Sequence, residues 1–364
     1  MRGQGRSICP HGGARPSSRN RAIAMKLQLL GDSGLRVSQL CLGTMTFGED
    51  WGWGAPRDTS KQIFDKFAEA GGNFLDTASV YTNGSSERLV GEFIASDRDA
   101  WVVATKYSLP DQFDKTQPAT KVGNARKNLR RSVEESLKRL NTDHIDVLYL
   151  HIWDFTTPTE EVMRSLDDLV RAGKVLYLGI SDTPAWIVSR AQTLAQFRGY
   201  TPFSVLQIEY SLLERTVERD LIPMARALGM SVAPWSPLKG GVLSGKYAHG
   251  EQTSRGGEVP AASLEVARIV GEEADKLGVS SAQLALAWLV AKNTIPILGA
   301  SKLQQFEDNL KCLDVKIPDE TLARLDDATK IEPGFPHDFL HAQFVQSRLL
   351  GEKYELLDGI SPRA

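Results

Sequence analysis

The stretch IDVLYLH (residues 145–151) is an apolar run that stops at an ionisable side chain, His151. Two earlier runs, NFLD and WVVATK, stop in the same way at Asp76 and Lys106, and Tyr81 follows Asp76 by five residues. In a barrel of parallel strands the carboxyl ends of all strands open onto one face, which brings together residues that are far apart in the sequence. The pattern therefore predicts that these four residues meet at one rim of a barrel and form an active site.

The same type of apolar run recurs along the chain, alternating with longer amphipathic segments. The expected strands are QLCLGTM (39–45), NFLD (73–76), WVVATK (101–106), IDVLYLH (145–151), KVLYLGIS (174–181), SVLQIEY (204–210), SVAPWS (231–236) and TIPILGA (294–300). The clearest helical stripe is formed by Ala125, Leu129, Val133, Leu137 and Leu140. Apolar strands that alternate with amphipathic helices are typical of a parallel sheet covered by helices. We therefore predict an α/β fold, a (β/α)8 TIM barrel.

The segments that flank these repeats define the expected domain organisation. Residues 1–25 contain several arginines but no acid, and we expect a disordered extension there, either a transit peptide or sequence upstream of a true start at Met25. Residues 26–330 are expected to form the barrel, with the stretch LQLLGDSGLRVS as a hairpin that closes its bottom. Residues 331–364 are expected to be a tail that packs on or near the barrel.

The composition limits the classes of function. The chain has 364 residues, 41% of them hydrophobic and 24% charged, and a formal net charge of −2, which offers no strong field for nucleic acid or an anionic membrane. No apolar run approaches the ~18 residues needed to span a bilayer. Cys9, Cys41 and Cys312 are widely spaced, which favours neither a disulfide framework nor a metal site. We expect a cytoplasmic protein without a metal.

The four ionisable residues together suit the reduction of a carbonyl group. A phenol has a pKa of about 10, so Tyr81 can donate a proton at neutral pH only if a neighbouring charge stabilises the phenolate. Lys106 can supply that charge, Asp76 can hold Lys106 in place, and His151 can bind the carbonyl oxygen. Each of these residues taken alone is more often structural, but their joint placement favours catalysis.

At this point the chain resembles the aldo-keto reductases over nearly all of residues 26–329. The motifs that carry the resemblance are LGTMTFG (42–48), LDTASVYTNGSSERLVGE (75–92), ATK (104–106), IDVLYLH (145–151), GISD (179–182), QIEYSLLER (207–215), APWSPLKGGVLSGKY (233–247) and LGASKLQQFEDN (298–309). The branch of the family with bacterial, fungal and potassium-channel β-subunit-like members is the most similar. The resemblance implies that Tyr81 is the proton donor, that Lys106 and Asp76 tune it, and that His151 orients the substrate.

The resemblance also implies a nicotinamide cofactor, NADPH or NADP+, bound across the top of the barrel. Ser181 and Gln207 match residues that hold the carboxamide, and Trp235 matches the aromatic residue on which the nicotinamide stacks. The other matched positions are Gly43, Thr44, Met45, Asp76, Asp182, Ser236, Leu238, Gly240, Ser244, Lys246, Gly299, Ser301, Lys302, Gln305 and Asn309. Two positions depart from the family: Asp182 replaces a common Asn, and Gln305 replaces a common Arg that binds the 2′-phosphate.

Two further sets of residues are expected to shape the ligand sites. Trp51, Trp53 and Trp153, together with Phe339 from the tail, are candidates for the walls of a pocket for an apolar or aromatic carbonyl compound. The glycine-rich stretch 239–261 is expected to fold over a ligand, because long loops in compact domains are usually functional or mobile. Within that stretch, Arg255 is a candidate for binding the 2′-phosphate.

Other functions remain open at this stage. A regulatory subunit similar to the potassium-channel β subunits would bind NADP(H) as a sensor and turn over slowly, although His151 favours an enzyme. An aldolase would use Lys106 as a Schiff-base nucleophile, which Asp76 disfavours by keeping the amine charged. The stretch GGVLSGK fits the start of a phosphate-binding P-loop, but Tyr247 follows where Ser or Thr is needed. The sequence does not indicate an oligomeric state.

Overall fold

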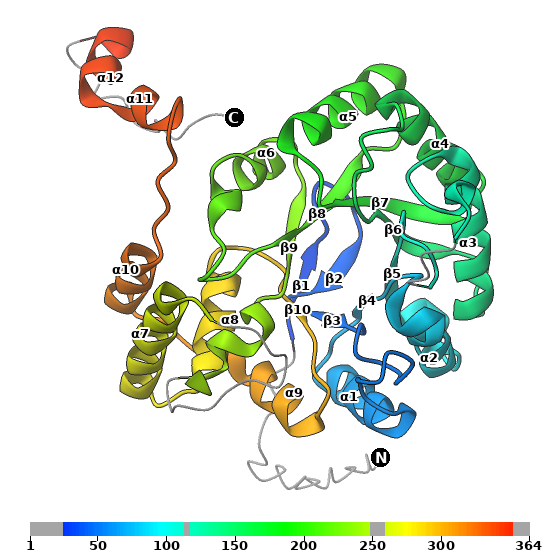
Figure 1. Cartoon of the computed structure of the whole chain (residues 1–364), viewed down its shortest axis with the longest axis horizontal. Coiled ribbons are helices and arrows are strands. Elements are labelled where there is room, and N and C mark those ends of the chain that lie inside the picture. The colour runs from blue at the N-terminus through cyan, green and yellow to red at the C-terminus, as the bar shows by residue number, and fades with distance from the viewer. Residues whose placement is uncertain (1–24, 113–116, 248–258, 352–364) are drawn as a thin grey trace, which may run out of the picture.

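The computed structural model describes residues 25–112, 117–247 and 259–351. Its main feature is a parallel sheet of eight strands in the order β10-β3-β4-β5-β6-β7-β8-β9 (Figure 1). These strands are β3 (Cys41–Gly43), β4 (Phe74–Asp76), β5 (Val102–Tyr107), β6 (Ile145–Leu150), β7 (Val175–Ser181), β8 (Phe203–Glu209), β9 (Ser231–Trp235) and β10 (Ile297–Leu298). The backbone N–H of Ile295 donates to Val232 O at 2.9 Å, so the two edges of the sheet meet. The predicted (β/α)8 barrel is confirmed.

The helices form a ring outside the strands (Figure 1). They are α1 (Arg57–Glu69), α2 (Ser85–Ile94), α3 (Arg126–Leu140), α4 (Thr159–Arg171), α5 (Ala185–Arg198), α6 (Leu221–Ala227), α7 (Ala261–Leu277), α8 (Ser281–Ala291), α9 (Leu303–Leu310) and α10 (Asp319–Ala328). Short 3-10 helices are η1 (Tyr81–Gly84), η2 (Arg98–Ala100), η3 (Ala119–Lys121), η4 (Thr216–Glu218), η5 (Lys239–Ser244) and η7 (Lys311–Asp314). Helix α3 buries Leu129, Val133, Leu137 and Leu140 of the predicted stripe, whereas Ala125 precedes the helix and is only partly buried; the helix ends where Asn141 adopts a φ of 51°, a left-handed conformation that stops a helix.

Some strands are shorter than the apolar runs predict. In β10 only Ile297 and Leu298 pair with β3, although seven residues of that run are suited to a strand. Pro296 lies just before β10 and has no N–H to donate, so it contributes only its carbonyl oxygen, which accepts from the N–H of Cys41 at 3.0 Å. The expected strand is therefore correct in kind and position but too long.

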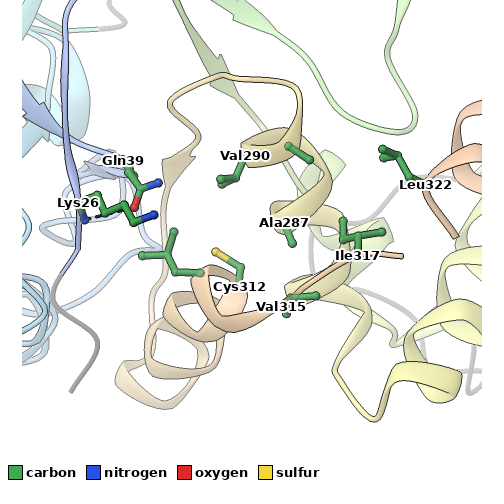
Figure 2. Close-up of a pocket in the computed structure, with 10 residues that line it drawn as sticks. Lys26, Gln39, Ala287, Val290, Cys312, Val315, Ile317 and Leu322 are labelled. Atoms are coloured by element: carbon green, nitrogen blue, oxygen red, sulfur yellow. Dashed lines mark hydrogen bonds between the residues drawn. The ribbon is translucent and has the colours of Figure 1, made fainter. Parts of the chain in front are cut away.

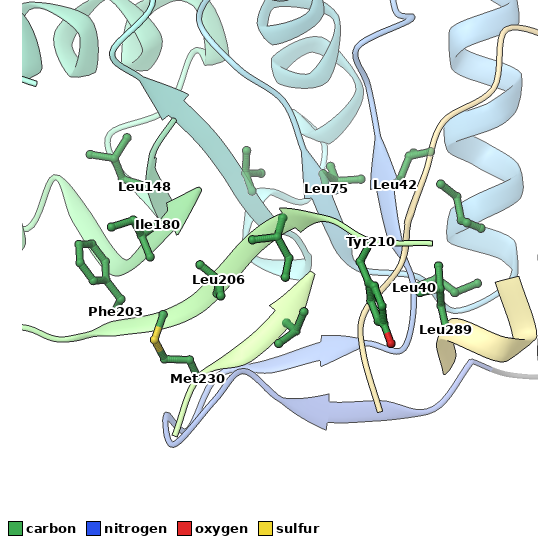
Figure 3. Packing of buried hydrophobic residues seen from close by; sticks show 14 of the residues in the cluster. Leu40, Leu42, Leu75, Leu148, Ile180, Phe203, Leu206, Tyr210, Met230 and Leu289 are labelled. Carbon is green, nitrogen blue, oxygen red and sulfur yellow. The ribbon is translucent and has the colours of Figure 1, made fainter. Parts of the chain in front are cut away.

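The core has two layers, because alternate residues of a strand point to opposite faces. Strand residues that face outward pack against the helices, as Leu148, Ile180 and Leu206 do in Figure 3. Residues that face inward, such as Val102 and Ala104, fill the barrel. Both residues lie on β5, and the next inward position on that strand belongs to Lys106. The alternation that builds the core thus also directs the lysine side chain into the barrel.

The predicted N-terminal hairpin is present and lies across the centre of the barrel (Figure 1). Its strands β1 (Leu27–Leu29) and β2 (Arg36–Ser38) are antiparallel. Leu30 and Val37 are fully buried and join the cluster that fills the barrel interior. The N–H of Gly31 donates to Ser231 Oγ at 2.7 Å, at the amino end of β9. The hairpin therefore seals the bottom of the barrel.

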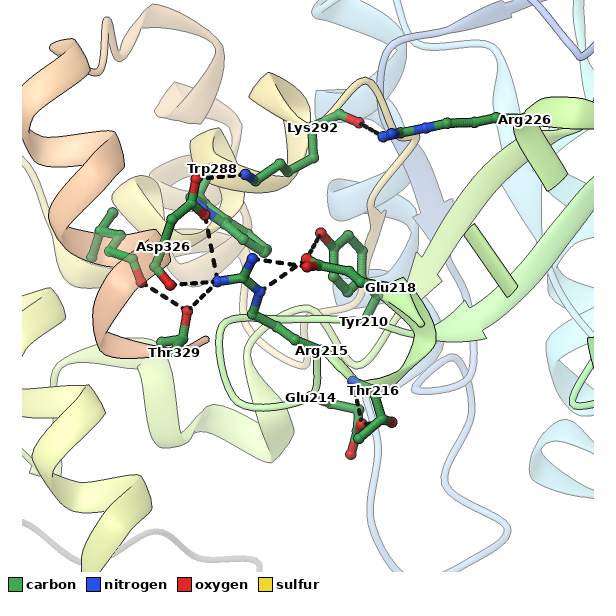
Figure 4. Close-up of polar contacts among 11 residues, drawn as sticks. Tyr210, Glu214, Arg215, Thr216, Glu218, Arg226, Trp288, Lys292, Asp326 and Thr329 are labelled. Atoms are coloured by element: carbon green, nitrogen blue, oxygen red, sulfur yellow. Dashed lines mark hydrogen bonds and ion pairs between the residues drawn. The ribbon is translucent and has the colours of Figure 1, made fainter. Parts of the chain in front are cut away.

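A polar network attaches α10 to the barrel (Figure 4). The guanidinium of Arg215, which is 9% exposed, donates to both carboxylate oxygens of Glu218 and to the backbone oxygen of Asp326. Asp326 also accepts from Trp288 Nε1 at 3.0 Å and from Lys292 Nζ at 2.7 Å. These bonds fix the end of α10 before the chain continues into the tail.

The described part of the tail contains two short helices, α11 (His337–His341) and α12 (Gln343–Leu350). Figure 1 shows them beyond α10, away from the barrel strands. Phe339, which the sequence offers as a pocket wall, contacts Phe335 and Phe344 of the tail instead. The prediction that Phe339 lines the substrate pocket is therefore not supported, because its ring packs within the tail. Residues 352–364 lie outside the described residues.

Candidate active site

Lys106 forms the centre of the candidate site. Its side chain is fully buried, and its ammonium donates to Asp76 Oδ2 at 2.6 Å and to the backbone oxygen of Thr77 at 2.9 Å. The ammonium also donates to Tyr81 OH at 3.2 Å. Strands β4 and β5 are neighbours and bring Asp76 and Lys106 together at their carboxyl ends. Three of the four predicted catalytic residues are thus in direct contact.

The buried charges of this group support one another. Burial alone would lower the pKa of Lys106, but the charge of Asp76 and the contacts with Asp76 and Tyr81 outweigh it and hold that pKa above its usual value. Burial raises the pKa of Tyr81, and the Lys106 ammonium opposes this effect only in part. The ammonium therefore stays charged and the phenol stays protonated at neutral pH. The sequence leads us to expect that Lys106 stabilises the phenolate of Tyr81; burial raises the pKa of Tyr81, and Lys106 does lower that pKa, but by less.

A strained turn presents Tyr81. The two residues after it, Thr82 and Asn83, have φ values of 44° and 53°, in the left-handed region that non-glycine residues rarely adopt. Thr82 Oγ1 donates to Phe47 O at 2.7 Å and accepts from the N–H of Ser86 at 3.0 Å. These two bonds stabilise the turn and leave the Tyr81 ring free to point toward Lys106.

A buried cluster of hydroxyl groups supports the end of β4. Ser86 Oγ lies 2.7 Å from Thr44 Oγ1 and 2.8 Å from Thr77 Oγ1. The N–H and the hydroxyl of Thr44 both lie 2.9 Å from the backbone oxygen of Asp76. The resemblance leads us to expect a cofactor contact for Thr44; the bonds that the structure shows for it fix the backbone that carries Asp76. The role of Ser86 is not visible in the sequence, because single serines occur at many structural positions.

His151 completes the predicted group of four. It follows β6, its N–H donates to Tyr107 O at 3.0 Å, and its ring lies 6.1 Å from the ring of Tyr81, centroid to centroid. Burial and then the Lys106 ammonium lower the pKa of His151 well below its usual value, so the imidazole is neutral at neutral pH. Its Nδ1 atom is buried without a hydrogen-bond partner among the described residues. A neutral ring with an unused polar atom suits the binding of a carbonyl oxygen.

Gln207 has a contact that the sequence does not predict. Its Nε2 amide donates to Asp76 Oδ1 at 2.7 Å, while Lys106 occupies Oδ2. Gln207 and Asp76 are 131 residues apart and reach each other across the inside of the barrel. Both are almost fully buried. Asp76 therefore has a strong donor on each of its two oxygens.

Glu87 forms a second buried carboxylate behind β5. It is fully buried, and it accepts from Thr105 Oγ1 at 2.6 Å and from Arg139 Nε at 2.5 Å. Thr105 precedes Lys106 and points to the opposite face of the strand. Glu87 thus ties the outer face of β5 to α3 and holds the strand that carries the lysine.

Of the tryptophans expected in the pocket, Trp51 makes a ring contact with Tyr81. Its ring lies edge-on to Tyr81 at 6.4 Å, and its Nε1 donates to Asn83 Oδ1 at 3.3 Å. Trp53 packs against Trp51 at 5.4 Å and is 42% exposed. Trp153, in the segment after β6, is buried and belongs to the larger hydrophobic cluster. Trp51 and Trp53 thus form an aromatic surface beside the Tyr81 hydroxyl.

The residues expected to bind the nicotinamide end of a cofactor lie on three consecutive strands. Ser181 of β7 is paired in register with Gln207 of β8, and Trp235 ends β9. Ser181 Oγ is buried without a hydrogen-bond partner among the described residues, so a polar ligand atom can use it. Trp235 is partly exposed, and its Nε1 donates to Asp182 Oδ1 at 3.1 Å. These features fit a nicotinamide carboxamide and ring.

The remaining cofactor candidates lie in loops that follow strands. The first part of the stretch 239–261 is the 3-10 helix η5, in which Val242 and Leu243 are buried, so it is more ordered than the sequence predicts. Gly240 and Gly241 have φ values of 63° and 97°, and a side chain at Gly240 would meet no atom within 4 Å. The open backbone there can approach a phosphate closely. Arg255 lies outside the described residues.

The other cofactor candidates end a strand, lie in a segment that follows a strand, or lie on α9. Gly43 ends β3, and a Cβ there would lie 2.7 Å from Ile297 Cγ2, so the strand packing requires glycine. Helix α9 begins after Lys302, and an amino terminus of this kind favours anions. Placed in these segments are Thr44, Met45, Ser236, Leu238, Ser244, Lys246, Gly299, Ser301, Gln305 and Asn309, of which Lys246, Gly299, Ser301 and Gln305 are exposed.

A separate cavity of about 270 Å³ lies outside the barrel, between the start of the hairpin and α8 (Figure 2). It is lined mainly by apolar residues, with Lys26 and Gln39 on one side. None of the predicted site residues lines it. Within the described residues there is also no group of acidic, histidine or cysteine side chains that could hold a metal ion, and no helix is long and apolar enough to cross a bilayer.

Comparison with known proteins agrees with this geometry. The model of the Aldo/keto reductase family matches residues 39–330. A norsolorinic acid reductase of Aspergillus flavus is 41% identical over 333 residues, which cover 88% of this chain and 84% of the relative. The aryl-alcohol dehydrogenase [NADP(+)] of Phanerodontia chrysosporium is 38% identical over 336 residues, covering 85% and 87%. The chain therefore belongs to the aldo/keto reductase family, whose members are oxidoreductases that act on carbonyl compounds with a nicotinamide cofactor.

Proposed function

We propose that this protein is an NADPH-dependent reductase of aldehydes and ketones in which Tyr81 donates the proton. The observation that carries the proposal is the contact between Lys106 Nζ and Tyr81 OH at 3.2 Å, with Asp76 at 2.6 Å on the other side of the ammonium. Reduction places negative charge on the former carbonyl oxygen, which needs a proton donor. Tyr81 carries a proton and lies next to the buried Lys106–Asp76 pair.

Lys106 makes the proton transfer feasible. Burial keeps Tyr81 protonated before reaction, because it raises the phenol pKa. Once the proton is transferred, the phenolate lies next to an ammonium that Asp76 keeps charged, and attraction between opposite charges is strong in a buried site. The bound cofactor supplies the hydride. Ser181, Gln207 and Trp235 are the residues that we propose to orient it.

His151 has a different role in this proposal. Its ring is neutral, so it carries one N–H and one bare nitrogen. We assign the N–H to the carbonyl oxygen of the substrate, next to the Tyr81 hydroxyl. Two donors on one oxygen fix the position of the carbonyl carbon and polarise the C=O bond before hydride transfer.

We further propose an aromatic substrate and a cytoplasmic location. Trp51 and Trp53 form an aromatic surface beside Tyr81, and planar rings stack favourably on such surfaces. The names of the relatives refer to an aryl alcohol and to norsolorinic acid. The described cysteines, Cys41 and Cys312, are buried free thiols, which fits a reducing compartment.

The charged state of Lys106 disfavours the aldolase alternative. A Schiff-base nucleophile must be an uncharged amine, whereas the pKa of Lys106 is raised and its ammonium binds Asp76. The sensor alternative predicts cofactor binding with almost no turnover. It is distinguished from the enzyme by the rate with a good substrate.

The decisive experiment is a panel of aromatic and aliphatic aldehydes and ketones of matched size, with NADPH consumption as the signal. We expect turnover with the aromatic compounds to exceed that with the aliphatic ones. The wild type is compared with Tyr81→Phe, which keeps the ring and removes the proton donor. NADPH binding without consumption for any compound would favour the sensor function and contradict the enzyme.

A further inference from the structure

Asp182 occupies an unusual position at the edge of the site. It directly follows β7 and has a φ of 39°, a left-handed conformation that Asp, Asn and Gly tolerate better than other residues. Its backbone oxygen accepts from the N–H of Trp153 at 3.4 Å. The backbone therefore directs the Asp182 carboxylate toward the end of β9, where Oδ1 accepts from Trp235 Nε1 at 3.1 Å.

The Asp182 carboxylate differs from the other acids nearby in its partners. Asp76 is neutralised by direct contact with Lys106, and Glu209 by Lys239 at 2.7 Å. In residues 25–112, 117–247 and 259–351, no cation lies within ion-pair distance of Asp182. Among the described residues its carboxylate accepts from the neutral indole N–H of Trp235, and the neutral hydroxyl of Ser181 also favours its ionised form. Asp182 thus places an acid without a paired cation at the edge of the Trp235 ring.

This acid acts on the same groups as the catalytic residues. Asp182 contributes to raising the pKa of Tyr81, and Lys106 helps to lower the pKa of Asp182. The pKa of Asp182 is raised overall, by burial first and also by the neighbouring Glu209, while the Trp235 N–H and Lys106 favour its ionised form. The carboxylate therefore lies within electrostatic reach of the space between Trp235 and the Tyr81–Lys106 pair.

We propose that Asp182 determines the preference of the site for the oxidation state of the cofactor, by favouring NADP+ over NADPH. The inference rests on the proposed function, in which the nicotinamide ring lies against Trp235. The oxidised ring carries a positive charge and the reduced ring does not. A carboxylate at the edge of the stacking residue attracts only the oxidised form, and one such charge in a partly buried site changes the affinity ratio by roughly tenfold.

Asp182 has two properties that substitutions can separate: its negative charge, and an oxygen that accepts the Trp235 N–H. Asp182→Asn retains an oxygen that can accept the Trp235 N–H, tolerates the positive φ and removes the charge. Asp182→Gly also tolerates the positive φ but removes the charge and the acceptor together. Asp99→Asn is the matched control, since it removes one exposed acid before the amino end of β5, at the opposite end of the strand from Lys106.

The experiment measures the dissociation constants of NADP+ and NADPH for the wild type and the three variants by calorimetric titration, without substrate. We expect Asp182→Asn to weaken NADP+ binding by roughly tenfold and to leave NADPH nearly unchanged. Asp182→Gly should show the same change in the ratio of the two affinities, together with weaker binding of both forms, because Trp235 loses its partner. Asp99→Asn should match the wild type.

The possible results separate this inference from the proposed function. If the wild type binds neither form, the proposed function fails and the inference fails with it. If both forms bind and Asp182→Asn leaves their affinity ratio unchanged, the charge has no role and the inference alone is overturned. Equal weakening of both forms in Asp182→Asn would also overturn it, because the residue would then act only through the position of Trp235.

Discussion

Gln207 and Lys106 bind different oxygens of one carboxylate: the Gln207 amide lies 2.7 Å from Asp76 Oδ1, and the Lys106 ammonium lies 2.6 Å from Oδ2. The carboxylate is therefore fixed in its plane, and with it the position of the ammonium beside Tyr81. The polar group that positions Lys106 beside Tyr81, the proposed proton donor, thus extends from β4 across the barrel to β8.

The first prediction concerns this bridge. Gln207→Met fills a similar volume but removes the donor to Asp76, and hydrogen bonds to charged groups contribute about 1.5–3 kcal/mol. We expect kcat to fall by roughly 10-fold or more at saturating NADPH. Gln304→Met, at an exposed position of α9, is the control and should behave as the wild type. An unchanged kcat in Gln207→Met would show that Lys106 alone positions the carboxylate.

The second prediction tests the proton donor. Tyr81→Phe removes only the hydroxyl that lies 3.2 Å from Lys106. We expect turnover of carbonyl reduction to fall by roughly 100-fold or more, the usual scale for a lost general acid, with cofactor affinity retained. Steady-state rates and a separate titration with NADPH measure the two effects. Near-normal turnover would rule out Tyr81 as the donor.

The third prediction concerns Trp235. If its ring stacks on the nicotinamide, binding of NADPH should quench indole fluorescence. Trp235→Ala should remove much of this quenching and weaken the affinity, whereas Trp186→Ala, an exposed residue of α5, should do neither. Quenching of wild-type size in Trp235→Ala would mean that another tryptophan reports the binding.

The fourth prediction concerns the 2′-phosphate that distinguishes NADPH from NADH. Lys302 is exposed at the start of α9, where a cation and a helix amino terminus both favour an anion. Lys302→Ala should raise the KM for NADPH by roughly 5- to 10-fold and barely change that for NADH, with a smaller effect at high salt. Equal losses for both cofactors, or a wild type that prefers NADH, would place the phosphate elsewhere.

The fifth prediction follows from the neutral state of His151. Its pKa in the folded protein lies well below the usual value, because of burial and then Lys106, whereas in the unfolded chain it titrates near 6.5. Below about pH 6.5 the unfolded chain therefore binds one more proton than the folded protein, and the free energy of unfolding decreases by up to about 1.4 kcal/mol for each pH unit.

Urea unfolding at neutral and at mildly acidic pH measures this contribution. His151→Asn should remove it and give a smaller loss of stability on acidification than the wild type. His341→Gln, at an exposed histidine of α11, should leave the pH dependence unchanged. The same acid-induced loss in wild type and His151→Asn would contradict the buried neutral imidazole.

The sequence predicts the barrel and the contacts among Asp76, Lys106 and Tyr81, for a physical reason. Parallel strands buried on both faces leave long apolar runs, and the residue that ends each run is placed at a common rim. Asp76, Lys106 and Tyr81 could therefore be grouped from their spacing. The contact between Gln207 and Asp76 could not, because it depends on side chains that meet across the barrel interior rather than on neighbouring strands.

The sequence also could not predict how burial and Lys106 together set the pKa of Tyr81. The spacing indicates that Lys106 and Tyr81 are close, but not that burial has the larger effect on the phenol. The left-handed turn at Thr82 is a similar case, since a β-branched residue gives no sign of a positive φ. Strand length also escaped prediction where Pro296 interrupts the pairing of β10.

The sealed bottom of the barrel has a kinetic consequence. Leu30 and Val37 are packed into the lower end, so within the described part of the chain the hairpin closes that approach to the proposed catalytic group. A cofactor that contacts Ser181 and Trp235 and a carbonyl compound that contacts Tyr81 would then share one entrance. If the cofactor lay deeper than the carbonyl compound, it would have to arrive first and leave last, and we would then expect ordered addition and release.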